Sequence, residues 1–244
     1  VTVSARGPSE AEIRAEITRV VRAYAAALEA KDVAAVRRLY PSMTDRRERE
    51  LRESLPNLRN LRVQLSVADV QLADIDHGCY TDLPLTLARH PSETDERMMV
   101  RLAALALNAH QVQDVCGGDA RIGFGAGLSS PDEPDVQLVD FTGRTRLWIE
   151  VGQPDDKPLA KACSKADAVI VYAFGPAAEV WWRGIEGKLA RLDKLQVWRI
   201  PALDAQALTA LAERSMQLQA TLQEGVLTLS SGRGSVSVEP LRWK

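Results

Sequence analysis

Apolar side chains recur at helical spacing through the first 60 residues, which predicts a helical N-terminal segment. Ser9 and Glu12 form a capping box, in which the two side chains satisfy free backbone amides at a helix start. The apolar positions that follow are Ile13, Ile17, Val20, Val21, Tyr24 and Leu28. A second helix is expected at 33–40, ended by Pro41. A third, at 45–55, is charged nearly all round, which favours a solvated helix with ion pairs over a patch for nucleic acid.

A strand follows these helices, and its alternation of apolar and polar residues shifts by one position near the middle. Leu65 and Val67 are apolar at odd positions, whereas Val70 and Leu72 continue at even ones. A one-residue slip turns every later side chain to the other face of a sheet. The pattern therefore indicates either a β-bulge near 68–69 or a junction between segments of different ancestry.

Over the rest of the chain, segments with helical spacing follow segments in which apolar and polar residues alternate. This order predicts an α/β protein of the α+β kind with a mixed sheet. The expected helices lie at 92–108, 158–165, 177–192 and 204–222. Ser92 is the expected cap of the first of them. The expected strands lie at 121–124, 136–140, 146–151, 168–172 and 196–200, and a hairpin turns around 232–234.

The composition, 45% apolar and 26% charged over 244 residues, is that of an ordinary globular protein. No apolar run approaches the roughly 20 residues that a membrane helix needs, and the first residues lack the basic and apolar stretches of a signal peptide. Three widely spaced cysteines favour reduced thiols over a zinc site. His77, His90 and His110 show no ligand spacing either. We therefore expect a cytoplasmic protein that makes no use of a membrane.

Charge is unevenly distributed along the chain. The net charge is −2 and the isoelectric point about 6.0. Residues 1–60 carry 12 Lys and Arg against 9 Asp and Glu, whereas the remainder carries 19 against 24. Because the larger part is acidic, a nucleic-acid partner would have to be attracted by a local basic patch.

The chain resembles the YaeQ family in several long strings from residue 73 onward: "ADIDHGCYTDLPLTLARHPSETDERMMVRLAALALNA", "GLSSPDEPDV", "LWIEVGQPDDKPLAKACSKA" and "LAERSMQLQATLQEG". The resemblance covers about residues 66–244. It implies a restriction-endonuclease-like PD-(D/E)XK fold, whose core order is helix, three-strand meander, helix and parallel strand. The order of elements expected from the hydrophobic pattern is the same.

The opening segment resembles a different family. The stretch "AYAAALEAKDVAAVRRLYPSM" is similar to the first helices of SnoaL-like cone-shaped domains, although the curved sheet of that fold has no counterpart here. We therefore expect a helical segment at 1–60 and a YaeQ-like domain at 61–244. Residues 1–65 are interpreted as a fused segment whose strand, "RVQLSVADV", stands in for the first strand of the family.

The nuclease resemblance implies acidic side chains that hold Mg²⁺, one before the second strand and one in an acid-x-lysine pattern on the third. Asp135, after Pro134, fills the first position, and Glu150 fills the second on the polar face of its strand. If the strands pair through the turn at 142–143, the two carboxylates meet at one end of the hairpin. The alternative is that Asp135 is a turn residue and Glu150 is simply exposed.

The lysine of that pattern is absent. Gly152 stands two residues after Glu150, and Gln153 follows it. A glutamine can orient an attacking water but carries no charge. Lys157 and Lys161 are candidates for a relocated lysine, with solvated helix charges as the alternative.

The helix expected at 92–108 adds a third acid. Glu96 lies away from the polar strip of this helix, which makes it a candidate buried carboxylate and a third metal ligand. A bond to a backbone amide near the helix start is the alternative. Glu93 lines up with Arg97 and is expected to form a surface ion pair.

Two functions follow from these residues. The first is a Mg²⁺-dependent nuclease or phosphodiesterase, with Asp135, Glu150 and Glu96 as ligands and with Gln153 and Lys161 assisting. The second is a catalytically inactive module that keeps the nuclease scaffold and binds nucleic acid or protein. The retained acids favour the first, and the missing lysine and the acidic charge favour the second.

Overall fold

The computed structural model describes residues 10–57, 63–89, 93–125 and 133–244. Its N-terminal part consists of α1 (Glu10–Glu29), α2 (Val33–Leu39), α3 (Asp45–Ser54) and the 3₁₀ turn Leu55–Asn57. The helical character predicted for this segment is therefore confirmed. The two predicted caps, Ser9 and Ser92, lie outside the described residues.

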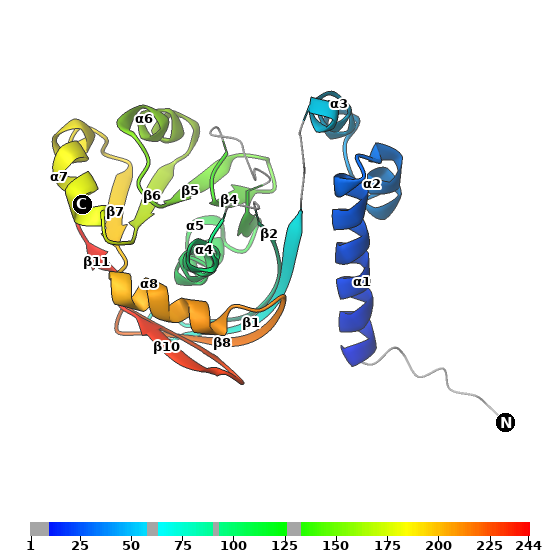
Figure 1. Cartoon of the computed structure of the whole chain (residues 1–244). Coiled ribbons are helices and arrows are strands. Elements are labelled where there is room, and N and C mark those ends of the chain that lie inside the picture. The colour runs from blue at the N-terminus through cyan, green and yellow to red at the C-terminus, as the bar shows by residue number, and fades with distance from the viewer. Residues whose placement is uncertain (1–9, 58–62, 90–92, 126–132) are drawn as a thin grey trace.

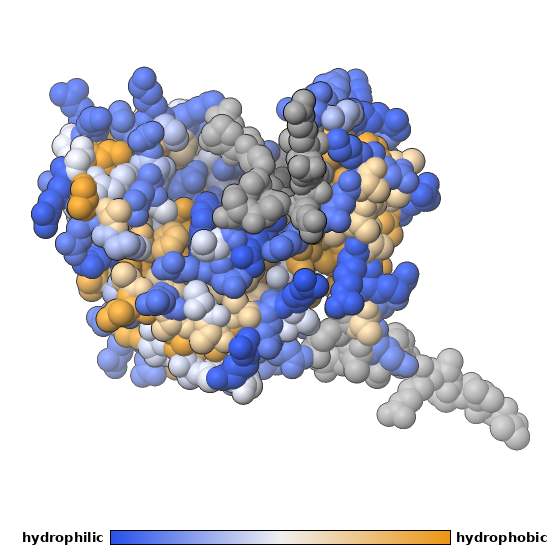
Figure 2. Space-filling view, viewed as in Figure 1, coloured by the Kyte–Doolittle hydropathy of each residue, from blue (hydrophilic) through white to orange (hydrophobic). Residues whose placement is uncertain are grey.

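The N-terminal helices pack around a small core of their own. Ala27, Val36 and Met43 are buried together there. Apolar side chains nevertheless remain visible over α1 and α2 (Figure 2), and Ile13 and Ile17 are each more than 40% exposed. These helices therefore bury only part of their apolar surface.

Helix α3 is held by ion pairs along its surface. Arg46 lies 2.9 Å from Glu50, and Arg52 lies 2.7 Å from Glu48, each pair one turn apart. No described residue of α3 is buried. The prediction of a solvated helix with ion pairs is confirmed.

The rest of the chain builds two mixed sheets (Figure 1). The first has the strand order β10-β9-β8-β1-β2 and contains β1 (Gln64–Asp74), β2 (Cys79–Arg89), β8 (Ser215–Gln223), β9 (Val226–Ser231) and β10 (Gly234–Val238). The second has the order β11-β7-β6-β5-β4-β3 and contains β3 (Ala120–Phe124), β4 (Val136–Asp140), β5 (Thr145–Val151), β6 (Ala168–Ala173), β7 (Leu195–Arg199) and β11 (Leu241–Arg242). Parallel and antiparallel pairs occur in both sheets, which confirms the α+β class.

Helix α4 (Asp95–Leu107) lies between the two sheets (Figure 1), and the run from Met98 to Ala106 is buried throughout. The same core includes α8 (Ala202–Leu208) and the 3₁₀ turn Thr209–Leu211. Helices α6 (Asp156–Lys165) and α7 (Ala178–Leu189) cover the other face of the six-stranded sheet and bury a second core. A short helix, α5 (Gln111–Cys116), follows α4. Because α4 is enclosed along its middle, its two ends are where polar groups from both sheets can meet.

Strand β1 runs without a bulge. It pairs with β2 residue for residue from Gln64 to Asp74. Val70 and Leu72 face the core around α4, whereas Leu65 and Val67 lie on the side of α1. Because α1 covers part of the outer face near Leu65 and Val67, the apolar positions change parity without any slip in register. The predicted bulge is wrong.

The helix predicted at 204–222 is also wrong in its second half. Helix α8 ends at Leu208, and Ser215–Gln223 forms β8. The segment is rich in good helix formers, yet alternate side chains along it are buried: Met216, Leu218, Ala220 and Leu222. Parallel pairing with β1 decides the outcome, because tertiary context overrides intrinsic propensity.

Strand β2 is not predicted from the sequence, which contains Pro84 in its middle. Proline cannot donate to a neighbouring strand and is normally confined to edges. β2 is the edge strand of its sheet, so Pro84 leaves the pairing with β1 intact.

From α4 onward, the elements run helix, three antiparallel strands (β3, β4 and β5), helix α6 and the parallel strand β6, with α5 inserted after α4. This arrangement places the start of β4, the end of β5 and the first turn of α4 next to one another, as the contacts of Arg97 show. Among the helices of the described residues, none combines the length and the apolar content needed to cross a membrane.

Candidate functional site

Asp135 and Glu150 lie opposite each other where β4 begins and β5 ends. Val136 pairs with Ile149 in this antiparallel hairpin, so the residues just outside that pair also face each other. The amide of Asp135 donates to the Ile149 carbonyl at 3.0 Å. The hairpin thus brings the two carboxylates selected by the sequence to the same end.

The carboxylate of Asp135 is already bound by a cation. Nη2 of Arg97, on the first turn of α4, lies 2.7 Å from Oδ1 and 2.9 Å from Oδ2 of Asp135. The amide of Val151 donates to Oδ2 at 2.7 Å. The Asp135 side chain is only 11% exposed, so these bonds form in a largely desolvated setting, where they are strong.

The buried acid at the start of α4 is Glu93 and not Glu96. The helix begins at Asp95 with Thr94 as its cap, so Glu93 precedes the first turn. Glu93 is 8% exposed and its Oε1 accepts from Nη1 of Arg97 at 2.8 Å. The predicted ion pair is confirmed, but it is buried on the acid side and not at the surface. Glu96 is half-buried, so the prediction of a buried carboxylate there is wrong.

Arg101 adds a second cation one turn further along α4. Its Nε lies 3.3 Å from Oε1 of Glu93, and its Nη2 donates to the Ala88 carbonyl at 3.0 Å. Burial lowers the pKa of Arg101. Two arginines therefore stand against the carboxylates of Glu93 and Asp135, so these four groups balance one another's charge.

Glu150 lies outside that balance. Burial raises the pKa of its carboxyl to about 7, opposed by a hydrogen bond from Nε1 of Trp148 at 2.6 Å and reinforced by the charge of Asp135. Arg97 lowers the same pKa by a smaller amount. A carboxyl that is partly protonated near neutral pH can give or take a proton during a reaction, which marks it as a candidate functional group.

The backbone explains why the lysine of the nuclease pattern is missing. Gly152 has a φ of 118°, a conformation that glycine adopts freely and lysine does not. The next residue, Gln153, donates from Nε2 to the Phe174 carbonyl at 2.8 Å. Lys161 lies on the exposed side of α6. The cation that the structure brings to Asp135 is Arg97.

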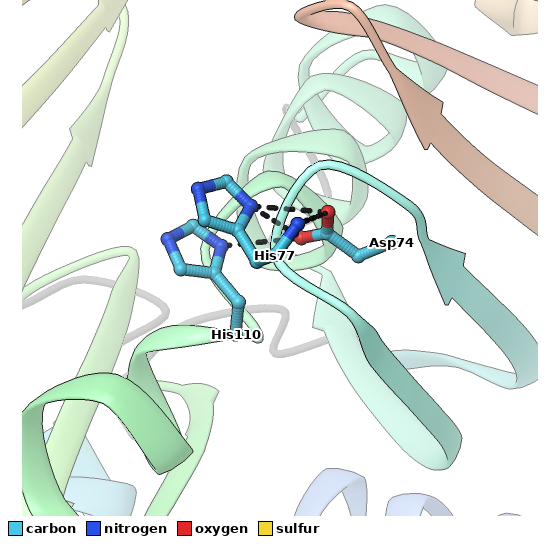
Figure 3. Close-up of side chains that lie close together, drawn as sticks. All are labelled: Asp74, His77 and His110. Atoms are coloured by element: carbon cyan, nitrogen blue, oxygen red, sulfur yellow. Dashed lines mark hydrogen bonds and ion pairs between the residues drawn. The ribbon is translucent and has the colours of Figure 1, made fainter.

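Three side chains that could share one metal ion come together elsewhere in the described residues. The ligand atoms of Asp74, His77 and His110 all lie within 4.8 Å of one another (Figure 3). Within the described part of the chain, Asp135 and Glu150 do not form such a set with Glu96. Counting histidines alone does not reveal the first cluster, because one of its members is an aspartate three residues before His77. His110 comes close only through the fold.

Comparison with known proteins identifies the larger part of the chain. The YaeQ protein family profile matches residues 60–240. The YaeQ protein of Salmonella typhi is 38% identical over 185 residues, which is 75% of this chain and 97% of that protein. The YaeQ protein of Escherichia coli K12 is 37% identical over the same length.

Solved structures agree with the sequence matches. The crystal structure of the YaeQ protein from Xanthomonas axonopodis pv. citri has a TM-score of 0.68 at 39% identity and covers 75% of this chain and 98% of its own. The crystal structure of the YaeQ protein from Pseudomonas syringae has a TM-score of 0.66 at 29% identity. The match covers 74% of this chain and 96% of that one.

The family match begins at residue 60, before β1 starts. β1 therefore lies within the matched region, which argues against a strand borrowed from another protein. Helices α1, α2 and α3 lie outside the match. With three quarters of its length matched by profile, relatives and crystal structures, the chain belongs to the YaeQ family.

Proposed function

We propose that this protein is a Mg²⁺-dependent phosphodiesterase acting on nucleic acid, built on a restriction-endonuclease-like PD-(D/E)XK fold. The observation that carries the proposal is the pairing of Asp135 with Glu150 across β4 and β5. Burial is the main cause of the raised pKa of Glu150, and the charge of Asp135 adds a smaller contribution in the same direction. A divalent cation held by both carboxylates would relieve this repulsion.

The donor set fits magnesium. Carboxylate oxygens are hard ligands, and Mg²⁺ is commonly held by one or two carboxylates while it keeps several waters. Asp135 and Glu150 would hold the ion, and water would take the place proposed for Glu96. When bound, Mg²⁺ would neutralise charge on the phosphate and make a bound water more acidic.

The chemistry of each side chain of the site suggests its role. Glu150, whose pKa is about 7 in the metal-free protein, would lose its proton when it binds the ion, so metal binding should strengthen as pH rises. Arg97 supplies the positive charge that lysine supplies in the usual pattern, and its planar guanidinium suits a phosphate oxygen pair. The bond from Gln153 to the Phe174 carbonyl orients its amide and leaves its oxygen to accept from a water. Lys161 on α6 is then a contact for the nucleic-acid backbone.

A second function rests on a different observation. Arg97 already neutralises Asp135, and Gly152 stands where the pattern has a lysine, so Asp135 needs no metal ion to balance its charge. A catalytically inactive module that binds nucleic acid or protein through this scaffold accounts for both features.

Nicking of supercoiled plasmid and cleavage of single-stranded RNA in Mg²⁺ or Mn²⁺ decide between the two. The proposal expects activity in the wild type, loss in Asp135→Asn and Glu150→Gln, and retention in Glu96→Gln, the matched control on α4. Activity that survives Glu150→Gln would remove the assigned site. A wild type that neither cleaves nor binds either metal by calorimetry would favour the inactive module.

A further inference from the structure

A second polar cluster lies at the far end of α4 from Arg97. Asp74 ends β1 and has no solvent exposure. A carboxylate in that position needs a cation or strong hydrogen bonds, because an isolated buried charge is very unfavourable. No Lys or Arg is paired with Asp74 in the described part of the chain, where its ion-pair partners are His77 and His110.

Both imidazoles turn the same nitrogen toward this carboxylate (Figure 3). Nδ1 of His77 lies 3.0 Å from Oδ1 and 3.0 Å from Oδ2 of Asp74. Nδ1 of His110 lies 3.3 Å from Oδ2. The two rings are stacked, with centroids 3.6 Å apart and planes inclined by 2°.

The spacing suits a transition metal. Ligand atoms about 2.0–2.1 Å from a tetrahedral Zn²⁺ lie about 3.3 Å from one another. The distances of 3.0 and 3.3 Å from the Asp74 oxygen to the two nitrogens are close to that value. All three ligand types are those that zinc accepts.

Hydrogen bonding alone leaves the cluster incomplete. Nδ1 of His110 is buried and makes no hydrogen bond. Two stacked imidazolium rings would repel each other, whereas two neutral imidazoles and one carboxylate are a normal ligand set for a divalent ion.

The ligands are held in place by their surroundings. The backbone amide of His77 donates to Oδ1 of Asp74 at 3.0 Å, which closes the turn between β1 and β2. That turn is tied to the β8–β9 turn, because Asp76 accepts from the amides of Glu224 and Gly225 at 2.7 and 2.8 Å. These bonds fix the backbone of Asp74 and His77, while the two parallel rings must tilt before both Nδ1 lone pairs point at one ion.

From this geometry we propose that Asp74, His77 and His110 bind one Zn²⁺-class transition-metal ion. In the described residues the set has three members, so a fourth position is left for water or a substrate atom, as in catalytic zinc sites. The His77 side chain is 38% exposed, which gives that position access to solvent. The site is separate from Asp135, because the 13-residue α4 spans about 20 Å between them.

The test uses the full chain after removal of metals with EDTA. In excess Mg²⁺, which occupies any site at Asp135 and Glu150, calorimetry with Zn²⁺ and visible absorption with Co²⁺ should give one ion per chain, with d–d bands of low coordination number. His77→Gln and His110→Gln should each weaken binding by at least about tenfold. Circular dichroism checks that each variant is folded. Because His77 is more exposed than His110, its replacement should disturb the fold less.

Three controls separate this site from its surroundings. Asp135→Asn should bind Zn²⁺ as the wild type does, because it alters the other end of α4. Cys79→Ser should leave the Co²⁺ spectrum unchanged, since a thiolate ligand would add an intense charge-transfer band. Removal of residues 1–59 should not change the stoichiometry. Absence of stoichiometric Zn²⁺ binding, or equal affinity in wild type and His77→Gln, would overturn the proposal in favour of a metal-free Asp–His cluster.

Discussion

Arg97 divides its guanidinium between two acids that come from different parts of the fold. Nη2 lies 2.7 Å from Oδ1 of Asp135 at the start of β4, while Nη1 lies 2.8 Å from Oε1 of Glu93 before α4. The Glu93 and Asp135 side chains are 4% and 11% exposed, and that of Arg97 is 36% exposed. One side chain therefore fixes the first turn of α4 against the six-stranded sheet.

Replacement of Arg97 by Ala should destabilise the protein by about 2–3 kcal/mol. The change leaves Asp135 with one amide donor and Glu93 with Arg101 alone, and breaking a buried pair costs about 3–5 kcal/mol before allowance for partial exposure. Urea unfolding measures the loss.

Arg183→Ala on α7 is the matched control. Arg183 is 77% exposed and lies 3.9 Å from Glu179, so its removal should change the free energy of unfolding by less than about 0.5 kcal/mol. Equal effects of the two substitutions would show that the Arg97 contacts contribute no special stability.

Glu150 should make stability fall as pH rises. Its pKa is raised from 4.5 to about 7 in the folded protein, so the folded state binds more protons than the unfolded state between these values. The contribution of Glu150 to the free energy of unfolding is fully present below pH 4.5 and is lost as the pH rises to about 7. The loss is at most about 3 kcal/mol.

Glu150→Gln removes this titration. The variant should be more stable than the wild type at pH 8, and the gap should narrow at pH 5. Urea unfolding at the two pH values measures it, with Glu96→Gln as the matched glutamate control. A gap that does not change with pH would contradict the raised pKa of Glu150.

Gly125 allows the end of β3 to pass against Pro134. A Cβ atom at residue 125 would lie 1.9 Å from the Pro134 carbonyl oxygen. Gly125→Ala should therefore shift the chain beside Asp135 and destabilise the fold by about 1–3 kcal/mol.

Gly187 on α7 gives the opposite expectation. A Cβ atom there meets nothing within 4 Å, so Gly187→Ala should stabilise the protein by about 0.5–1 kcal/mol through helix propensity. Thermal unfolding of both variants measures the contrast. The same sign for both would contradict the close approach at Gly125.

The sequence predicts the parts of the fold that have local patterns. Helix α4 and strands β4 and β5 follow from periodicity, whereas the nuclease resemblance selects Asp135, just before β4, and Glu150 on β5. β8 could not be recognised because its residues are good helix formers, and only pairing with β1 makes it a strand. β2 is not predicted because Pro84 argues against a strand, although an edge strand tolerates a proline.

The sites show the same limit. Glu93 was placed at the surface because the helix was expected to begin at Ser92, whereas the cap at Thr94 leaves Glu93 before the helix and buried. The cluster of Asp74, His77 and His110 forms because the end of α4 brings His110 next to the turn between β1 and β2. No spacing along the chain encodes such a long-range contact.

Removal of residues 1–59 should leave a folded YaeQ domain of lower solubility. The N-terminal helices have a separate core of Ala27, Val36 and Met43, and the family match starts only at residue 60. Without α1, Leu65 and Val67 on the outer face of β1 become exposed, and exposed apolar strand surface promotes association. Cooperative thermal unfolding should persist, while light scattering should report self-association that Val67→Ser reduces in the truncated chain. A truncated protein without a cooperative transition would show instead that α1 belongs to the folding unit.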